Sequence, residues 1–108
     1  MEIQQIRYFL SAARELNFTR AAAKCNVTQP SLTRAIGLLE MELGGDLFRR
    51  ERNLTHLTYL GNRMLPLMQQ CIDNADQAMR VAKAIRSNAI VSLELGLRDG
   101  IPMEPFVP

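Results

Sequence analysis

Polar side chains gather in the stretch NVTQPSLTRAI, residues 26–36, away from its apolar residues. Gln29 carries an amide that can pair with adenine, and the hydroxyl of Thr33 can bond to bases or phosphates. Arg34 can pair with guanine or phosphate, and Pro30 offers the apolar contact that a thymine methyl group favours. Because a buried helix has no use for this set, we expect the first two turns of this helix to contact a polar partner.

Four helices and a hairpin are expected to position these side chains. Apolar residues at helical spacing predict helices at 3–16, 18–25 and 29–43. A short hairpin follows at 46–58 and a long helix at 59–88. The chain of 108 residues is long enough for one small domain with a core.

The turn between the second and third helices has the residues of a helix-turn-helix. Asn26 tolerates the left-handed conformation that a tight turn needs, and Val27 fills the turn. Thr28 is the expected N-cap of the third helix, which Leu32 anchors on its inner face. In a helix-turn-helix the second helix of the pair lies in the DNA major groove, with its N-terminal residues at the bases. The pattern therefore predicts a DNA-reading surface on residues 29–34.

Arginines near the tip of the expected hairpin point to the same kind of partner. Arg49, Arg50 and Arg52 are placed to reach the DNA backbone or minor groove as a wing. The simpler alternative is a charged tip that only faces water. Residues 1–63 hold nine Lys or Arg against six Asp or Glu, so this part is mildly basic and favours a polyanionic partner.

The long helix carries a heptad stripe, with apolar or small residues at alternating spacings of four and three. The stripe consists of Met64, Met68, Cys71, Ala75, Ala78, Ala82 and Ile85. Its small residues let two helix backbones approach closely, and it is longer than so small a domain can cover. We therefore expect a second copy of the chain to pair with it, the alternative being packing within one chain. Pro66 is expected to bend the helix near its start.

Several other classes of function find no support in the sequence. Cys25, Cys71 and the one histidine, His56, cannot complete a zinc site, and no cofactor is expected. Cys25 is expected to be a small core residue and not a redox switch. We expect no enzyme activity, because His56 has no nucleophile beside it and no Gly-rich phosphate loop occurs. No apolar run approaches the roughly 20 residues that span a bilayer, and no signal peptide is visible, which predicts a cytoplasmic protein without membrane contact.

A series of short motifs covers the first 66 residues. In order they are FTRAAA, VTQPSLTR, LE.ELG, LF.R, LT..G and LP. Together they resemble the winged helix-turn-helix of LysR-type transcriptional regulators, and the resemblance extends along the long helix to about residue 88. It implies a mainly α fold in three parts: a winged helix-turn-helix of three helices and a two-stranded wing at 1–58, a dimerisation linker helix at 59–88, and the start of a truncated effector-binding domain at 89–108.

The resemblance also implies which residues touch DNA. They are Thr28, Gln29, Pro30, Ser31, Thr33, Arg34, Arg50 and Asn53. The family often has arginine where this chain has Asn53, so either Arg52 takes over the minor-groove contact or that contact is lost. Gly37 and Leu38 stand where the family often has polar or basic residues, which predicts fewer phosphate contacts along the far half of the third helix.

These observations predict a sequence-specific, duplex-DNA-binding transcriptional regulator that acts as a homodimer, or as a tetramer in a longer protein. Its linker helices would pair antiparallel, as the resemblance implies, and a small-molecule inducer would bind the domain that is mostly missing. The alternative is a winged-helix module that binds another protein and not DNA. Salt-dependent affinity for DNA distinguishes the two.

Overall fold

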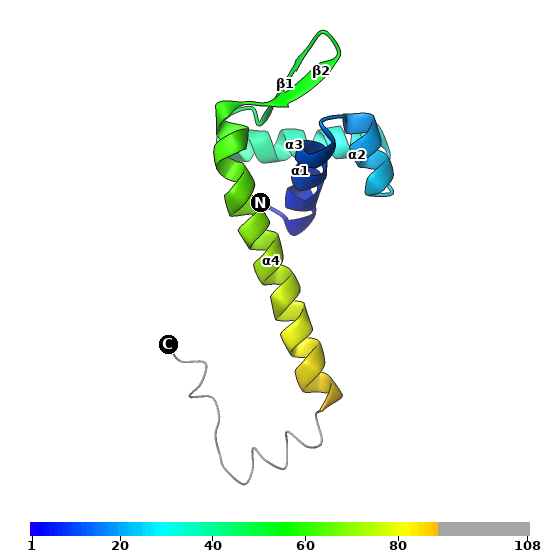
Figure 1. The fold of residues 1–108 in the computed structure, drawn as a ribbon, viewed down its shortest axis with the longest axis vertical. Helices are drawn as coiled ribbons and strands as arrows, with labels where there is room; N and C mark the ends of the chain where they lie inside the picture. The colour runs from blue at the N-terminus through cyan, green and yellow to red at the C-terminus, as the bar shows by residue number, and fades with distance from the viewer. Residues whose placement is uncertain (89–108) are drawn as a thin grey trace. The chain divides into compact units, whose positions relative to one another are not determined.

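The computed structural model describes residues 1–88 and confirms a mainly α winged helix-turn-helix followed by a long helix. In chain order its elements are α1 (Ile3–Glu15), α2 (Phe18–Lys24), α3 (Gln29–Leu43), β1 (Phe48–Glu51), β2 (Leu54–Leu57) and α4 (Tyr59–Ser87) (Figure 1). The expected start of a further domain at 89–108 lies outside the described residues.

The helix ends lie where their capping residues predict. The side chain of Asn17 accepts a hydrogen bond from the Arg20 N–H at 2.8 Å, which fixes the start of α2. Thr28 does the same for α3, accepting the Ser31 N–H at 3.3 Å. Asn26, in the turn between them, has a φ of 59°, the left-handed conformation expected of it.

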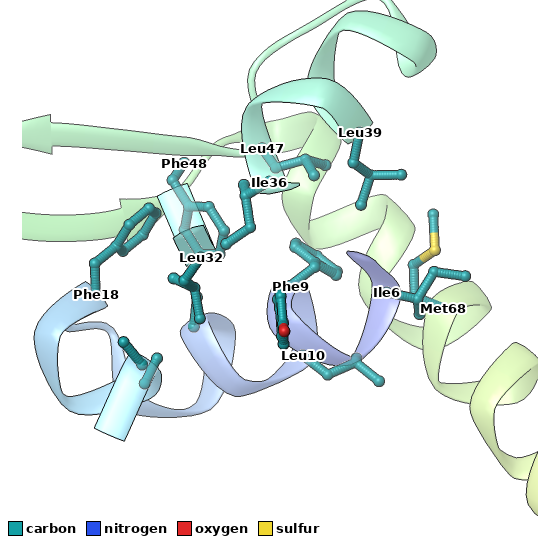
Figure 2. Packing of buried hydrophobic residues seen from close by; sticks show 14 of the residues in the cluster. Ile6, Phe9, Leu10, Phe18, Leu32, Ile36, Leu39, Leu47, Phe48 and Met68 are labelled. Atoms are coloured by element: carbon teal, nitrogen blue, oxygen red, sulfur yellow. The ribbon is translucent and has the colours of Figure 1, made fainter. Parts of the chain in front are cut away.

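One apolar core joins α1, α2, α3, the base of the hairpin and α4. The largest fully buried side chains are Phe9, Leu32, Ile36, Leu39 and Leu47 (Figure 2). Ala21 and Ala22 are also buried, and these small residues let α2 pack closely against its neighbours. Cys25 packs against this core, half-buried, in agreement with its expected structural role.

An aromatic cluster fixes the base of the hairpin. The ring of Phe48 lies 5.6 Å from that of Phe9 and 5.2 Å from that of Phe18, the second pair meeting edge to face. Phe48 is the first residue of β1, so these contacts tie the strand directly to α1 and α2 (Figure 2).

The hairpin closes with a two-residue turn. Glu51 pairs with Leu54, which leaves Arg52 and Asn53 as the loop. Both have positive φ, 49° and 66°, as a type I′ turn requires, and this turn matches the twist of the two strands. Asparagine tolerates this conformation readily, so the turn forms without glycine.

The first half of α4 is part of the core, which corrects the predicted dimer stripe. Met68 and Ile72 are only 3% and 5% exposed, and Met64 packs against the same core. Met68 is therefore buried within its own chain and cannot contact a second one. Met64 also packs mainly against its own chain. The remaining stripe members are Cys71, Ala78, Ala82 and Ile85, which are exposed, and Ala75, which is half-buried.

The compact body extends further than the predicted boundary after residue 58. It comprises Met1–Asn74, because Met68 and Ile72 of α4 complete its core, and a second unit begins at Ala75. α4 ends at Ser87, one residue before the end predicted from the sequence.

Replacing Met68 with alanine should lower the free energy of unfolding by about 2–5 kcal/mol, because it leaves a cavity in the core. Met79→Ala is the matched control, since it makes the same change in the same helix at a side chain that is 66% exposed. Urea unfolding of both variants at one protein concentration measures the difference. Equal losses would show that Met68 is not a core residue of the single chain.

Candidate nucleic-acid interface

α3 presents one face to the core and the opposite face to solvent. Leu32, Ile36 and Leu39 are buried on the inner side. At the same four-three-four spacing, half a turn away, lies an outward stripe of Pro30, Arg34, Gly37 and Met41. Three members of this stripe are exposed and Gly37 is half-buried, so the outward positions predicted for Pro30 and Arg34 are as expected.

A third side of α3 faces the hairpin. Glu40 accepts hydrogen bonds from the backbone N–H groups of Leu47, at 2.7 Å, and Phe48, at 3.4 Å. Gln29 and Thr33 precede Glu40 by eleven and seven residues, which places all three on one side of the helix.

The hydroxyl oxygen of Thr33 is covered by the protein and has no hydrogen-bond partner among the described residues. A covered oxygen cannot bond to a base, so a contact of Thr33 with DNA would require its side chain to turn outward. The DNA contact of Thr33 stays a prediction.

A cleft of about 330 Å³ brings the start of α2, the start of α3 and the hairpin together. It is lined by Leu16, Asn17, Phe18, Thr19, Gln29, Arg50, Arg52, Asn53 and Thr55. The lining contains two guanidinium groups, several neutral hydrogen-bonding side chains and no carboxylate, so the cleft suits an anion such as a phosphate. Four of the predicted site residues meet here: Gln29, Arg50, Arg52 and Asn53.

Arg50 is held in place by the aromatic cluster. Its guanidinium carbon lies 3.9 Å from the centre of the Phe18 ring, a cation–π contact. A guanidinium carries five N–H donors, and none of those of Arg50 is used by this ring contact, so they can serve a phosphate or a base. Phe18 is in turn fixed by Phe48, so the core orients this arginine.

Strand alternation separates Arg50 from Arg49. Successive residues of a strand point to opposite faces, so Arg50 shares the face of Phe48 and Arg49 does not. Arg49 pairs across the strands with His56 and does not line the cleft. The wing arginines therefore comprise a fixed one beside the core, Arg50, and one at the turn, Arg52.

The hydroxyl groups of Thr28 and Ser31 are bonded to each other at the helix start. Thr28 donates to the Ser31 oxygen at 2.9 Å and accepts from the Ser31 backbone N–H at 3.3 Å. Thr28 thus uses its proton within the cap, whereas the hydroxyl proton of Ser31 remains available to an acceptor. Both residues are exposed.

Three cleft residues were missed by the sequence analysis as contact residues: Asn17, Thr19 and Thr55. The side-chain oxygen of Asn17 also caps α2. The sequence shows that these residues are polar, but only the folded hairpin brings Thr55 beside the start of α2.

Neither a metal site nor a membrane span competes with this cleft among the described residues. Between residues 1 and 88, no group of three or more His, Cys, Asp or Glu side chains could hold a metal ion. In the same range, no helix combines the length and apolar character that crossing a membrane requires.

Comparison with known proteins identifies relatives of this interface. Residues 3–62 match the family of bacterial regulatory helix-turn-helix proteins, lysR family. The uncharacterized HTH-type transcriptional regulator YnfL of Escherichia coli K12 is 32% identical over 94% of this chain and 34% of its own length. The HTH-type transcriptional regulator BudR of Klebsiella aerogenes is 33% identical over 99% of this chain and 75% of its own length.

Solved structures share the fold. The BenM_DBD/catB site 1 DNA complex is 36% identical with a TM-score of 0.76, covering 81% of this chain and 97% of that one. The CbnR_DBD–DNA complex is 30% identical with a TM-score of 0.74, covering 80% of this chain and 99% of that one. The chain spans about a third of the length of YnfL and of IlvR, a regulator from Caulobacter vibrioides.

The covered hydroxyl of Thr33 leads to a stability prediction. Thr33→Val should raise the free energy of unfolding by about 1 kcal/mol, because it removes a buried hydroxyl that lacks a partner and keeps the shape of the side chain. Thr28→Val, the same change at the N-cap, should lower it by about 0.5–2 kcal/mol. Urea denaturation tests both, and a loss of stability in Thr33→Val would mean that its hydroxyl is bonded.

Proposed function

Because the chain belongs to the lysR family of bacterial regulatory helix-turn-helix proteins, we propose that it is the DNA-binding and dimerising part of a transcriptional regulator. Several relatives that match most of this chain are transcriptional regulators, and two structural neighbours were solved as complexes with DNA. The family match covers α1, α2, α3 and the wing, the elements that form the candidate interface.

The observation that carries this proposal is the shared cleft of the wing and the start of α3. It places Gln29, which can pair with adenine, beside Arg50 and Arg52, which attract phosphate. One surface thus combines a group that distinguishes bases with groups that supply affinity. In the proposed complex, α3 enters the major groove by its N-terminal turns and the wing lies over the adjacent backbone and minor groove.

The residues at this surface take different roles. Pro30, Ser31 and Arg34 are exposed and free to meet base edges or phosphates, and Arg52 and Asn53 lie at the wing tip for the minor groove. Thr28 acts mainly as the cap that sets the start of α3. A protein-binding winged-helix module remains the alternative, but the absence of carboxylates from the cleft lining favours a polyanion.

We also propose that the chain forms a homodimer through α4, beyond the part that belongs to the core. The exposed members of the heptad stripe, Cys71, Ala78, Ala82 and Ile85, together with the half-buried Ala75, form the contact. Their small side chains allow two helices to approach closely, and the family resemblance implies an antiparallel pair. A two-fold dimer presents two recognition helices, so the operator should be an interrupted palindrome. In the whole protein the dimers would assemble further into a tetramer.

The longer relatives suggest how the whole protein responds to signals. A Corynebacterium glutamicum OxyR mutant, H2O2-bound in its solved structure, is 32% identical to this chain with a TM-score of 0.74, and the match covers 26% of that chain. We propose that the whole protein binds a small-molecule inducer outside residues 1–88 and acts on DNA in the cytoplasm. This part of the chain needs no cofactor to bind DNA.

Two substitutions should separate phosphate attraction from base choice. Arg50→Ala should weaken binding to all duplexes and lower the salt slope by about one unit, because a phosphate contact is lost. Gln29→Ala should cost about 1–3 kcal/mol on a duplex selected from random sequences and much less on random DNA. Fluorescence anisotropy at several salt concentrations measures both effects, with Arg86→Ala at the end of α4 as the control for charge. If Gln29→Ala lost the same affinity on selected and on random DNA, Gln29 would not be a residue that distinguishes bases.

A charge placed in the α4 stripe should prevent dimerisation. Ala78→Glu should leave the compact body folded but yield monomers in sedimentation velocity, because the carboxylate would be buried between two helices. Arg80→Glu places a carboxylate on the opposite side of the same turn and should leave the dimer intact. A parent chain that stays monomeric at high micromolar concentration would contradict the dimer.

A further inference from the structure

Nothing in the described part of the chain requires a glycine at position 37. It lies in the middle of α3, where glycine destabilises a helix relative to alanine. Its φ is not positive, so the backbone does not require glycine. A Cβ atom added there would meet nothing within 4 Å. An alanine would therefore fit the fold and strengthen the helix.

The other glycines of residues 1–88 each have a structural reason. Gly44 ends α3 with a φ of 83°, which favours glycine. A Cβ on Gly45 would lie 3.0 Å from the side chain of Leu60, and one on Gly61 would overlap the carbonyl oxygen of Leu47. Among these four glycines, only Gly37 is required neither by its backbone conformation nor by packing within the protein. A contact with a binding partner would explain it.

Gly37 lies on the outward side of α3, beyond the N-terminal turns that form the proposed interface. It belongs to the outward stripe of α3, three residues after Arg34 and four before Met41. Toward the end of the helix its exposed neighbours are apolar, since Leu38 is 51% exposed and Met41 is 78% exposed, whereas Arg34 lies on the side toward the helix start. A partner that meets this part of the stripe therefore meets bare helix backbone flanked by apolar side chains.

We propose that Gly37 is a specificity-determining residue that lets α3 lie directly against base edges of the major groove. This inference rests on the proposed DNA-binding function and adds the contact that the second half of the helix makes. The apolar surface of the major groove is the C5-methyl group of thymine, so the class of base step recognised here is one that carries a thymine. Leu38 and Met41 would enclose that methyl group from the side.

Close approach at Gly37 also serves the polar contacts nearer the helix start. Hydrogen bonds weaken steeply with distance, so a side chain at position 37 that held the helix away from the groove would lengthen the bonds of Arg34 and Gln29. The glycine would thus influence base choice through its own contact and through the depth at which the whole helix lies.

Gly37→Ala in the 108-residue chain tests the inference. The melting temperature should rise by about 4–8 °C, because alanine is the better helix former. Affinity for a duplex selected by the parent chain should fall about tenfold, with less than about a twofold change on random duplex. Gly37→Ser serves as a second variant, with the same loss of affinity but a smaller gain in stability.

Replacing each thymine of the selected duplex in turn with deoxyuridine locates the contact. At one position, the loss of the thymine methyl group should weaken binding of the parent chain but not that of Gly37→Ala. This non-additivity is expected if Gly37 contacts that methyl group. Unchanged affinity of Gly37→Ala, a lower melting temperature, or an equal loss on random DNA would each overturn the role of Gly37. A parent chain with no salt-dependent affinity for any duplex would instead overturn the proposed function, before any variant is compared.

Discussion

The backbone of Leu47 is the junction on which the interface depends. Its N–H is bound by the Glu40 side chain of α3, at 2.7 Å, and its carbonyl accepts the Thr58 N–H at the start of α4, at 3.0 Å. Its side chain is fully buried, and Gly61 of α4 lies so close that no side chain fits there. The residue Leu47 therefore ties together α3, the wing and α4. The direction of the wing is set by these hydrogen bonds, of which the one to Glu40 is partly buried, and by core packing.

Capping and turn residues were enough to predict the fold. They could not show whether the apolar stripe of α4 packs against its own chain or against a second copy. Caps at Asn17 and Thr28 and the left-handed Asn26 act within a few residues, so the sequence shows them directly. The α4 stripe is different, because the compact body includes the helix only as far as Asn74. Met68, an early member, is buried in its own core, whereas Ala78, Ala82 and Ile85 follow that body along the chain. Periodicity alone cannot show where the domain stops covering the helix.

The candidate site was predictable in its residue types and not in its arrangement. Gln29 and the wing arginines were found from the sequence, because their chemistry and rough position follow from the motif. The difference between Arg49 and Arg50 depends on strand register, which the burial of Phe48 sets. The covered hydroxyl of Thr33 depends on how the rest of the fold packs around α3, which the local sequence does not show. Such contacts determine which polar side chains reach a partner.

The wing combines an arginine that is ordered before binding with one that is not held by the core. Arg50 contacts the Phe18 ring, which restricts its side chain before any partner binds. Ordering a long side chain at an interface costs about 0.5–1.5 kcal/mol, so this contact would lower that cost if Arg50 binds a phosphate as proposed. Arg52 stands in the exposed turn and must be ordered by the partner. In the proposed complex, a fixed contact by Arg50 would favour one register of the wing on DNA, whereas a contact by Arg52 could follow differences in groove width. The hairpin would then hold a constant position on the backbone while its tip adapts to the sequence beneath it.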